Sequence, residues 1–187
     1  MPPLTTERLL VRPFAEGDVP AVAAVLEADP VDAAIDRYVR HGALNASVLA
    51  ALSQPPLGDR AVVLRASGEL IGVAGLVPAF APFDQLRPIA ESPPQERDPA
   101  PYRIEVGLFY QVRPDHRGHG YATEAARALV GFAFTALQLG RVVATTDHDN
   151  LPSQAVMRHL GMRVQENALP EPPWFQLTGI LGNSRLP

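Results

Sequence analysis

Short branched apolar runs alternate along the chain with longer stretches in which apolar residues recur at helical spacing. Short apolar runs bounded by turn residues predict β-strands. Such runs occur at Glu7–Phe14, Ala61–Ala66, Leu70–Val77, Tyr102–Val112, Arg141–Thr146, Met162–Gln165 and Phe175–Leu181. The second and third runs flank Ser67-Gly68-Glu69, which predicts a hairpin.

The longer stretches predict helices. The first begins after Asp18, a helix-capping residue type, with Pro20 in its first turn. The others are expected at Val31–Leu52, Thr123–Leu139 and Leu151–Leu160. Gly42 is expected to interrupt the helix over Val31–Leu52. Strands that alternate with helices predict an α/β protein.

One proline-rich segment, residues 78–101, separates the third and fourth predicted strands. A loop of this length inside a compact domain is usually functional or disordered, and the alternative is a stiff surface excursion. The chain has 187 residues, which fits one domain over 1–187 with this loop inserted in it.

Composition narrows the classes of function. The formal net charge is −4, which argues against nucleic acid or an anionic membrane as a partner. The chain has no cysteine, so disulfides, thiolate nucleophiles and cysteine-bound metals are excluded, and we expect no metal. The longest apolar stretch, Leu70–Phe83, is too short and too broken by proline to span a bilayer. The first residues lack the apolar core of a signal peptide, so we expect a cytoplasmic protein.

The candidate chemistry lies in residues 112–125, a strand end, a glycine-containing turn and a helix start. Free N–H groups and the dipole at a helix N-terminus form an anion site. Gly118 and Gly120 would let a phosphate approach the main chain, and Arg117 adds positive charge. No Gly-Lys-Ser/Thr follows and a third glycine is missing, so neither a Walker loop nor a dinucleotide fingerprint is present. The alternative is an ordinary tight connection.

The segment Arg117–Ala122 resembles the Arg/Gln-x-x-Gly-x-Gly/Ala signature of the GNAT superfamily of N-acetyltransferases. Other segments resemble the subgroup that includes the RimJ and RimL ribosomal-protein N-acetyltransferases, namely Thr6–Pro13, Gly120–Ala125, Asn150–Ser153 and Leu160–Met162. The resemblance implies the α+β GNAT fold, a mixed central sheet of about seven strands with flanking helices. In that fold the sheet is splayed between strands 4 and 5.

The resemblance also implies acetyl-CoA as co-substrate and assigns residues to it. The pantetheine arm would pair with the main chain of the fourth strand at Gln111, Val112 and Arg113. The pyrophosphate would lie on the amides of Arg117, Gly118, His119, Gly120, Tyr121, Ala122 and Thr123. Asn150 would bond the pantetheine arm, and it is also a good helix N-cap.

The implied reaction is direct attack of an amine on the thioester in a ternary complex. Many members carry a tyrosine seven residues after the asparagine as general acid, and here that position is Met157, which cannot donate a proton. Ser153 is the substitute acid and pantetheine contact that we hypothesise, although such a serine also bonds the local backbone. Glu105 is the first candidate base, or else a charge at the start of its strand that is paired with Arg103 or Arg12. The segment Asp147–Asp149, which includes His148, is the second candidate.

The acceptor side is expected at Trp174 and Phe175, which would form a wall for the substrate or belong to the core. The predicted function is transfer of an acetyl group to a primary amine, either a protein N-terminus or a small molecule. The alternatives are a non-catalytic acyl-CoA-binding or regulatory module and a transferase for a different acyl-CoA. The superfamily makes a homodimer the default expectation.

Overall fold

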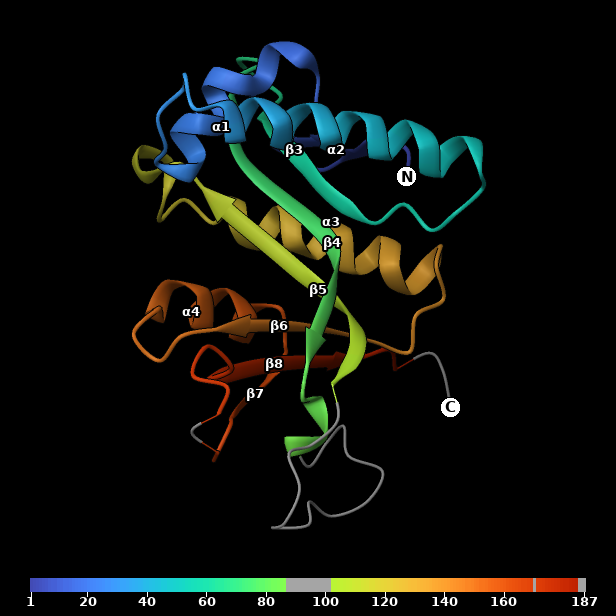
Figure 1. Ribbon diagram of the computed structural model, residues 1–187, viewed down its shortest axis with the longest axis vertical. Coiled ribbons are helices and arrows are strands. Elements are labelled where there is room, and N and C mark those ends of the chain that lie inside the picture. Colours follow the sequence, from blue (N-terminus) through green and yellow to red (C-terminus); the bar gives the residue numbers. More distant parts are fainter. Residues whose placement is uncertain (87–101, 170, 185–187) are drawn as a thin grey trace. The chain divides into compact units, whose positions relative to one another are not determined.

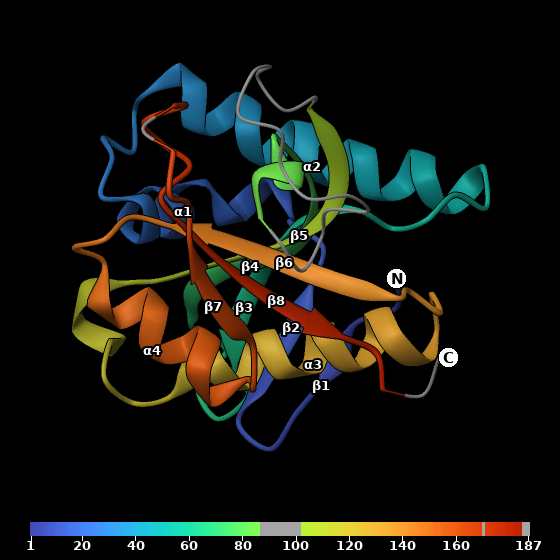
Figure 2. The ribbon, with the colours of Figure 1, turned by 90° about the horizontal axis from the view of Figure 1, so that it is seen from below.

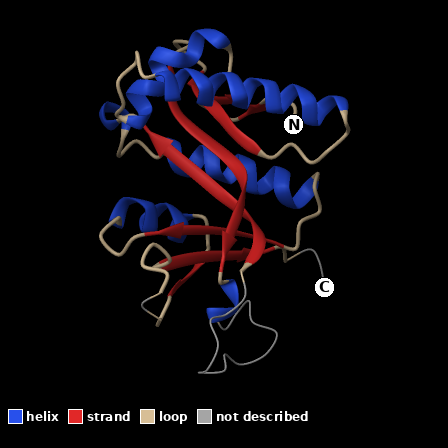
Figure 3. Ribbon diagram, in the orientation of Figure 1, coloured by secondary structure: helices blue, strands red, loops and turns tan. Residues whose placement is uncertain are grey.

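The computed structural model describes residues 1–86, 102–169 and 171–184, and contains strands and helices in alternation (Figures 1 and 3). The strands are β1 (Leu4–Thr5), β2 (Leu9–Arg12), β3 (Gly58–Leu64), β4 (Leu70–Ala81), β5 (Arg103–Val112), β6 (Arg141–Thr146), β7 (Arg163–Glu166) and β8 (Leu177–Gly182). The α-helices are α1 (Val19–Leu26), α2 (Ala33–Ala51), α3 (Tyr121–Thr135) and α4 (Leu151–His159). In this part of the chain no helix combines the length and apolar character that crossing a membrane requires.

The strands form one mixed sheet in the order β1-β2-β3-β4-β5-β6-β8-β7. The β5–β6 pair is parallel, with Gly107 opposite Val143, and the β6–β8 and β7–β8 pairs are antiparallel. The predicted α+β fold is confirmed. Over the described residues the sheet has eight strands, one more than predicted, because Leu4 and Thr5 pair with Val11 and Leu10. A two-residue strand has no detectable alternation, so the sequence did not predict it. The predicted strands 4 and 5 are therefore β5 and β6.

The chain divides into two compact units, and the first comprises residues 1–77 and 108–138. In this unit α1 and α2 lie on one face of the strands and α3 lies on the opposite face (Figures 1 and 2). The core beneath α1 and α2 is built from buried aliphatic and aromatic side chains, among them Phe14, Val22, Val25, Val39, Val63 and Val73. The alternation of side chains along β3 turns Ala61 and Val63 towards this core.

Helix α2 passes through Gly42 without a break, so the predicted interruption is wrong. A Cβ atom at Gly42 would lie 2.7 Å from Cδ2 of Phe14. Phe14 is only 5% exposed, so its ring has little freedom to move away. The glycine is therefore explained by the close approach of an aromatic ring, a tertiary cause that helix propensity does not contain.

The second unit comprises residues 78–107 and 139–187. Within it α4 packs on β8, where Met157 is fully buried and a Cβ atom at Gly179 would lie 3.0 Å from its Sδ. A second cluster contains Phe83 and Phe175, whose ring centroids lie 5.5 Å apart in a T-shaped arrangement. These contacts cover the strands with apolar side chains from helix and loop alike.

Strand β4 continues to Ala81, so the predicted proline-rich loop begins later than expected. Residues 83–85 then form a 3₁₀ turn, and the remainder of the predicted loop, residues 87–101, lies outside the described residues. The strand extends past Pro78 because Ala81 and Phe83 are both fully buried in the second unit. Burial of these apolar residues outweighs the proline, which strands accept where its missing N–H is not required.

Candidate functional site

The connection between β5 and α3 is a turn that depends on two glycines. Gly118 and Gly120 have φ angles of 80° and 78°, in the left-handed region that side chains disfavour. Gly120 is the N-cap of α3, and it supplies no side-chain oxygen to the helix. The N–H of Glu124 bonds to the carbonyl of Gly120 at 3.0 Å, as the first helical hydrogen bond. The N–H groups of Tyr121–Thr123 therefore remain available to an anion.

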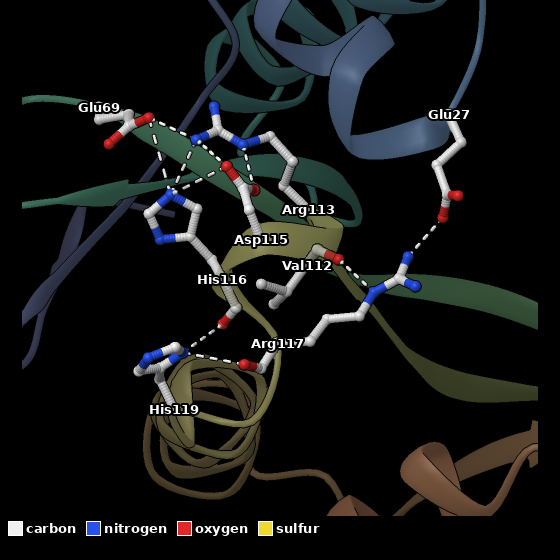
Figure 4. Close-up of polar contacts among 8 residues, drawn as sticks. All are labelled: Glu27, Glu69, Val112, Arg113, Asp115, His116, Arg117 and His119. Atoms are coloured by element: carbon white, nitrogen blue, oxygen red, sulfur yellow. Dashed lines mark hydrogen bonds and ion pairs between the residues drawn. The ribbon is translucent and has the colours of Figure 1, made fainter.

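The side chain of Arg117 is held by two partners at the edge of this turn (Figure 4). Its Nε donates to the carbonyl of Val112 at 3.0 Å, and its Nη2 donates to Oε1 of Glu27 at 2.5 Å. Glu27 follows α1 with a positive φ of 54°. The guanidinium thus contributes to the shape of the turn through Val112, and its charge is partly balanced by Glu27.

Arg113 is the centre of a second polar cluster, also drawn in Figure 4. Its Nη2 donates to Oε1 of Glu69 at 2.6 Å and lies 2.8 Å from Nε2 of His116, while its Nε donates to Asp115 at 2.6 Å. Hydrogen bonds from Arg113 to Asp115 and Glu69 raise its pKa above the usual value. The side chain of Arg113 therefore braces the turn, and its main chain is engaged as well, because its carbonyl accepts the N–H of His116 at 2.9 Å.

Arg8 is a cation at this turn that sequence reasoning did not assign to the site. Its Nη1 donates to the carbonyl of His119 at 3.0 Å, and its guanidinium carbon lies 4.6 Å from the ring centroid of Tyr121. The ring of His119 stacks on Tyr121 from a centroid distance of 5.8 Å. Arg8 belongs to the Thr6–Pro13 segment already noted for its resemblance, but its partners lie more than 110 residues away and nothing local indicates them.

The main-chain N–H and C=O groups of the last residues of β5 point alternately to the two edges of the strand. The N–H of Arg113 bonds to the carbonyl of Ile71 in β4 at 2.8 Å. The carbonyl of Gln111 also points to β4, where a Cβ atom at Gly72 would lie 2.7 Å from it. Because neighbouring residues of a strand point to opposite edges, the polar groups of Val112 face away from β4. Val112 is thus the residue of this stretch with the right orientation for an added pseudo-strand.

In the second unit, the start of α4 carries two of the expected residues. Asn150 is the N-cap, and its Oδ1 accepts the N–H of Ser153 at 3.1 Å. Ser153 therefore lies in the first turn of α4, where its backbone is hydrogen-bonded to the side chain of Asn150. Met157 is 0% exposed and packs in the core, and its thioether offers no proton to a leaving group.

Glu105 on β5 forms an ion pair with Arg141, the first residue of β6. Oε2 of Glu105 accepts from Nε of Arg141 at 2.9 Å, and Oε1 accepts from Nη2 of the same guanidinium. The parallel register places the two residues side by side, each two positions before the Gly107–Val143 pair. Both oxygens of this candidate base are therefore engaged by one cation, and the partner is neither of the arginines that the sequence had suggested.

The two aromatic residues expected at the acceptor wall have different surroundings. Trp174 is 48% exposed, whereas Phe175 is 1% exposed and packs edge-on against Phe83. Phe175 also reaches a pocket of about 250 Å³ formed entirely within the second unit. The pocket is lined by His148, Asn167, Ala168, Leu169, Pro172, Pro173, Phe175 and Gln176.

The expected residues thus gather in two groups. Residues 111–113, expected at the pantetheine arm, and residues 117–123, expected at the pyrophosphate, lie at the end of β5 and in its connection to α3, within the first unit. Glu105, Asn150, Ser153, Trp174 and Phe175 belong to the second unit. Among the described residues, no group of three or more histidine or acidic side chains is arranged to hold a metal ion.

The mixed sheet with its parallel β5–β6 pair, the two-glycine turn that opens α3 and the family match together identify an acetyl-CoA-dependent N-acetyltransferase. The chain belongs to the family described as the acetyltransferase (GNAT) domain, whose sequence profile matches residues 8–163. The matched family model is the RimJ/RimL-like one that the sequence resemblance indicated.

Individual relatives agree with this family. The uncharacterized N-acetyltransferase YnaD of Bacillus subtilis is 29% identical over 164 residues, which cover 86% of this chain and 82% of that protein. The crystal structure of an acetyltransferase from Agrobacterium tumefaciens has a TM-score of 0.66 and 26% identity, and the match covers 97% of this chain and 94% of that one. The RimL ribosomal L7/L12 alpha-N-protein acetyltransferase in complex with coenzyme A has a TM-score of 0.59 at 16% identity over 95% of both chains, which supports the fold alone.

Proposed function

We propose that this protein transfers the acetyl group of acetyl-CoA to a primary amine, on a protein N-terminus or a small molecule, by direct attack in a ternary complex. The observation that carries the proposal is the pair of left-handed glycines, Gly118 and Gly120, at the N-terminus of α3. They leave consecutive N–H groups at the positive end of a helix dipole, which suits a pyrophosphate. The related RimL structure contains coenzyme A, which supports the same class of ligand here.

Different residues would hold different parts of the cofactor. Amides from Arg117 to Thr123 would bind the pyrophosphate. The outward N–H of Val112 would pair with the pantetheine arm, while its carbonyl accepts from Nε of Arg117. Gln111 and Arg113 contribute by keeping this end of β5 hydrogen-bonded to β4 and to α1, since Nε2 of Gln111 donates to the carbonyl of Val25 at 2.8 Å. Asn150 would bond the pantetheine arm while it caps α4.

The chemistry sets three requirements. An alkyl ammonium with a pKa of about 10 must lose a proton before it can attack. The tetrahedral intermediate needs a hydrogen-bond donor for its oxyanion, for which an N–H of β5 is the candidate. The departing thiolate can take a proton from Ser153, or leave unaided because a thiol has a pKa near 8.5. Glu105 and His148 are the two candidates for the base.

The acceptor would lie on the second unit, against Trp174 and the pocket that Phe175 lines. RimL, by its name, acetylates the N-terminus of a ribosomal protein, and this favours an amine with an adjacent carbonyl group. A small-molecule amine fits the same requirements, because the pocket volume of about 250 Å³ suits one residue-sized group.

The test is calorimetric titration of acetyl-CoA into the purified protein and into Gly120→Glu. Saturable binding that the substitution abolishes would support the proposal, because the new side chain brings strain and negative charge to the turn. Gly131→Ala, in the exposed middle of α3, is the matched control and should bind normally. Absence of binding by the folded wild-type protein would overturn the proposal. Binding without release of coenzyme A on addition of any amine would favour the non-catalytic module, and thiol release has no background from a chain without cysteine.

A further inference from the structure

We infer that His148 is the general base of the reaction, and that the pocket beside it receives the group that carries the acceptor amine. The inference rests on the proposed function, because it assumes that the acceptor is an amine. His148 lines the pocket and its side chain is 52% exposed, whereas the carboxylate of Glu105 is 12% exposed and bound to Arg141.

The backbone of His148 is fixed on both sides by glutamine side chains. Its N–H donates to Oε1 of Gln176 at 2.8 Å, and its carbonyl accepts from Nε2 of Gln154 at 2.9 Å. Gln154 is 5% exposed, and its own Oε1 accepts from Arg158 of α4 at 3.1 Å. A loop histidine that is merely solvated has no need of such support, whereas a base requires a fixed position relative to its substrate.

The same contacts join His148 to the wall of the pocket. Nε2 of Gln176 donates to the carbonyl of Pro173 at 3.0 Å, so one glutamine bridges the β6–α4 turn and the β7–β8 connection. The carbonyl of Pro172 accepts the N–H of Phe175 at 2.9 Å, and Phe175 is anchored in the core. The pocket and the histidine are therefore held as one unit by hydrogen bonds and by a buried aromatic ring.

The imidazole of His148 also has an orienting carboxylate. Its Nε2 lies 3.6 Å from Oε1 of Glu166, at the end of β7. With an N–H at Nε2 directed to Glu166, the lone pair of Nδ1 is left to accept a proton, and the imidazolium that forms is stabilised by the carboxylate. The charged and titratable groups on the surrounding elements are Arg163 and Glu166 of β7, Glu171 of the β7–β8 connection, Asp147 and Asp149 of the turn, and Arg158 and His159 of α4.

The proton balance is complete with these groups and acetyl-CoA. An N–H bond of the acceptor ammonium breaks and its proton moves to Nδ1 of His148. The freed lone pair of the amine forms the bond to the acetyl carbon, and the electron pair of the C–S bond leaves with sulfur. The second proton of the nitrogen passes to the thiolate to give coenzyme A, and the imidazolium releases its proton to solvent. Both oxygens of Glu105 already accept hydrogen bonds from Arg141, whereas Nδ1 of His148 is left to the amine in this arrangement.

The test measures kcat/KM against pH for wild type, His148→Gln and Glu105→Gln, with alanine amide, an alanyl peptide and spermidine as probe amines. We expect His148→Gln to lose about 100-fold or more at pH 7, with a deficit that shrinks above pH 9 as solvent deprotonates the amine. A residue with only a positioning role would lower the rate equally at every pH. Glu166→Gln should lose less than His148→Gln, because it alters the orientation of the base and leaves it present.

The controls separate this inference from the proposed function. His148→Gln must still bind acetyl-CoA and unfold at the wild-type temperature, and His41→Gln, on the exposed face of α2, should retain full activity. A pH-dependent loss in Glu105→Gln with an unchanged rate in His148→Gln would overturn the inference while leaving the function intact. Acetyl-CoA binding without acceleration of any probe amine would also overturn it. Loss of acetyl-CoA binding by wild type would instead remove the function on which it rests.

Discussion

The guanidinium of Arg8 and the carboxylate of Glu124 join the first β-hairpin to the first turn of α3. Nε of Arg8 donates to Oε2 of Glu124 at 2.7 Å, and the backbone N–H of Arg8 donates to Oε1 at 2.9 Å. The hydroxyl of Thr6 also donates to Oε1 of Glu124 at 2.5 Å. Since Arg8 also bonds the carbonyl of His119 and covers the ring of Tyr121, this pair holds the glycine turn in shape before any cofactor arrives.

Glu124→Gln should therefore destabilise the fold by about 1–3 kcal/mol, the usual effect of losing hydrogen bonds to a charged group. Urea unfolding of the variant and wild type at pH 7 measures it. Glu16→Gln is the matched control, because Glu16 contacts Arg40 at 3.5 Å with a side chain that is 81% exposed. Such exposed pairs contribute little, so this variant should unfold like wild type. Equal stability of all three proteins would contradict the role given to Glu124.

The same pair predicts a pH dependence. Burial raises the pKa of Glu124, but hydrogen bonds from Thr6 and Arg8 outweigh it and the net shift is downward. A lowered folded-state pKa means that the carboxylate stabilises the fold above its unfolded value of about 4.3, and that this contribution is lost as pH falls through the folded value. The stability gap between wild type and Glu124→Gln should narrow steadily below pH 4. A stability difference that stays constant down to pH 3 would argue against this role of the Glu124 carboxylate.

Two helical glycines should respond to alanine with opposite signs. Gly42→Ala puts a methyl group 2.7 Å from the buried Phe14 ring, so we expect a loss of about 1–3 kcal/mol from overpacking. In Gly131→Ala the new Cβ atom has no neighbour within 4 Å, so the fold should gain about 0.5–1 kcal/mol of stability from helix propensity alone. Denaturant unfolding measures both, and the pair Phe14→Leu with Gly42→Ala should recover part of the loss. Stabilisation by Gly42→Ala alone would show that the ring moves freely.

Tyr38→Phe removes a hydrogen bond from a buried carboxylate. The Tyr38 hydroxyl donates to Oδ2 of Asp59 at 2.7 Å, and burial already raises the pKa of Asp59. We expect the free energy of unfolding to fall by about 1–3 kcal/mol at pH 7, because the ionised carboxylate loses this partner. A raised folded-state pKa disfavours the ionised form in the fold, so the penalty applies above that pKa and disappears as Asp59 is protonated. Unfolding at pH 7 and pH 4 should give a larger deficit at pH 7, and the opposite order would contradict this account.

Ser153→Ala tests the proposed acid without disturbing the helix. The N-cap bond from Asn150 goes to the backbone N–H of Ser153, which alanine retains. If the hydroxyl protonates the thiolate, kcat should fall by about 10- to 100-fold while the dissociation constant of acetyl-CoA stays near its wild-type value. Steady-state kinetics and calorimetry together make this measurement. An unchanged kcat would mean that the thiolate leaves unaided.

Local pattern was sufficient for most elements of the fold. Strand β6 was predicted with its observed ends at Arg141 and Thr146, and the start of α1 followed from Asp18 and Pro20. The missed features all depend on distant residues. The two-residue β1 exists through pairing with β2, and Gly42 continues a helix because of Phe14.

The candidate site also has a part that the local sequence predicts and a part that depends on distant residues. The glycine turn is a local motif, and its glycines have the backbone angles that an anion site requires. The partners of the charged side chains are not local, since Arg117 meets Glu27 and Glu105 meets Arg141 across 90 and 36 positions. Sequence spacing carries no information about such pairs unless they share a helix or a hairpin. The choice between Glu105 and His148 as base needed the structure for this reason.

The two glutamine side chains that hold His148 are uncharged at every working pH. Ionic strength weakens guanidinium–carboxylate pairs at the surface but has little effect on amide hydrogen bonds of this kind. The β6–α4 turn should therefore keep its geometry from dilute buffer to concentrated salt. A change of turnover rate with salt would then report how the highly charged coenzyme A approaches the arginine-containing glycine turn, and not a distortion around the histidine.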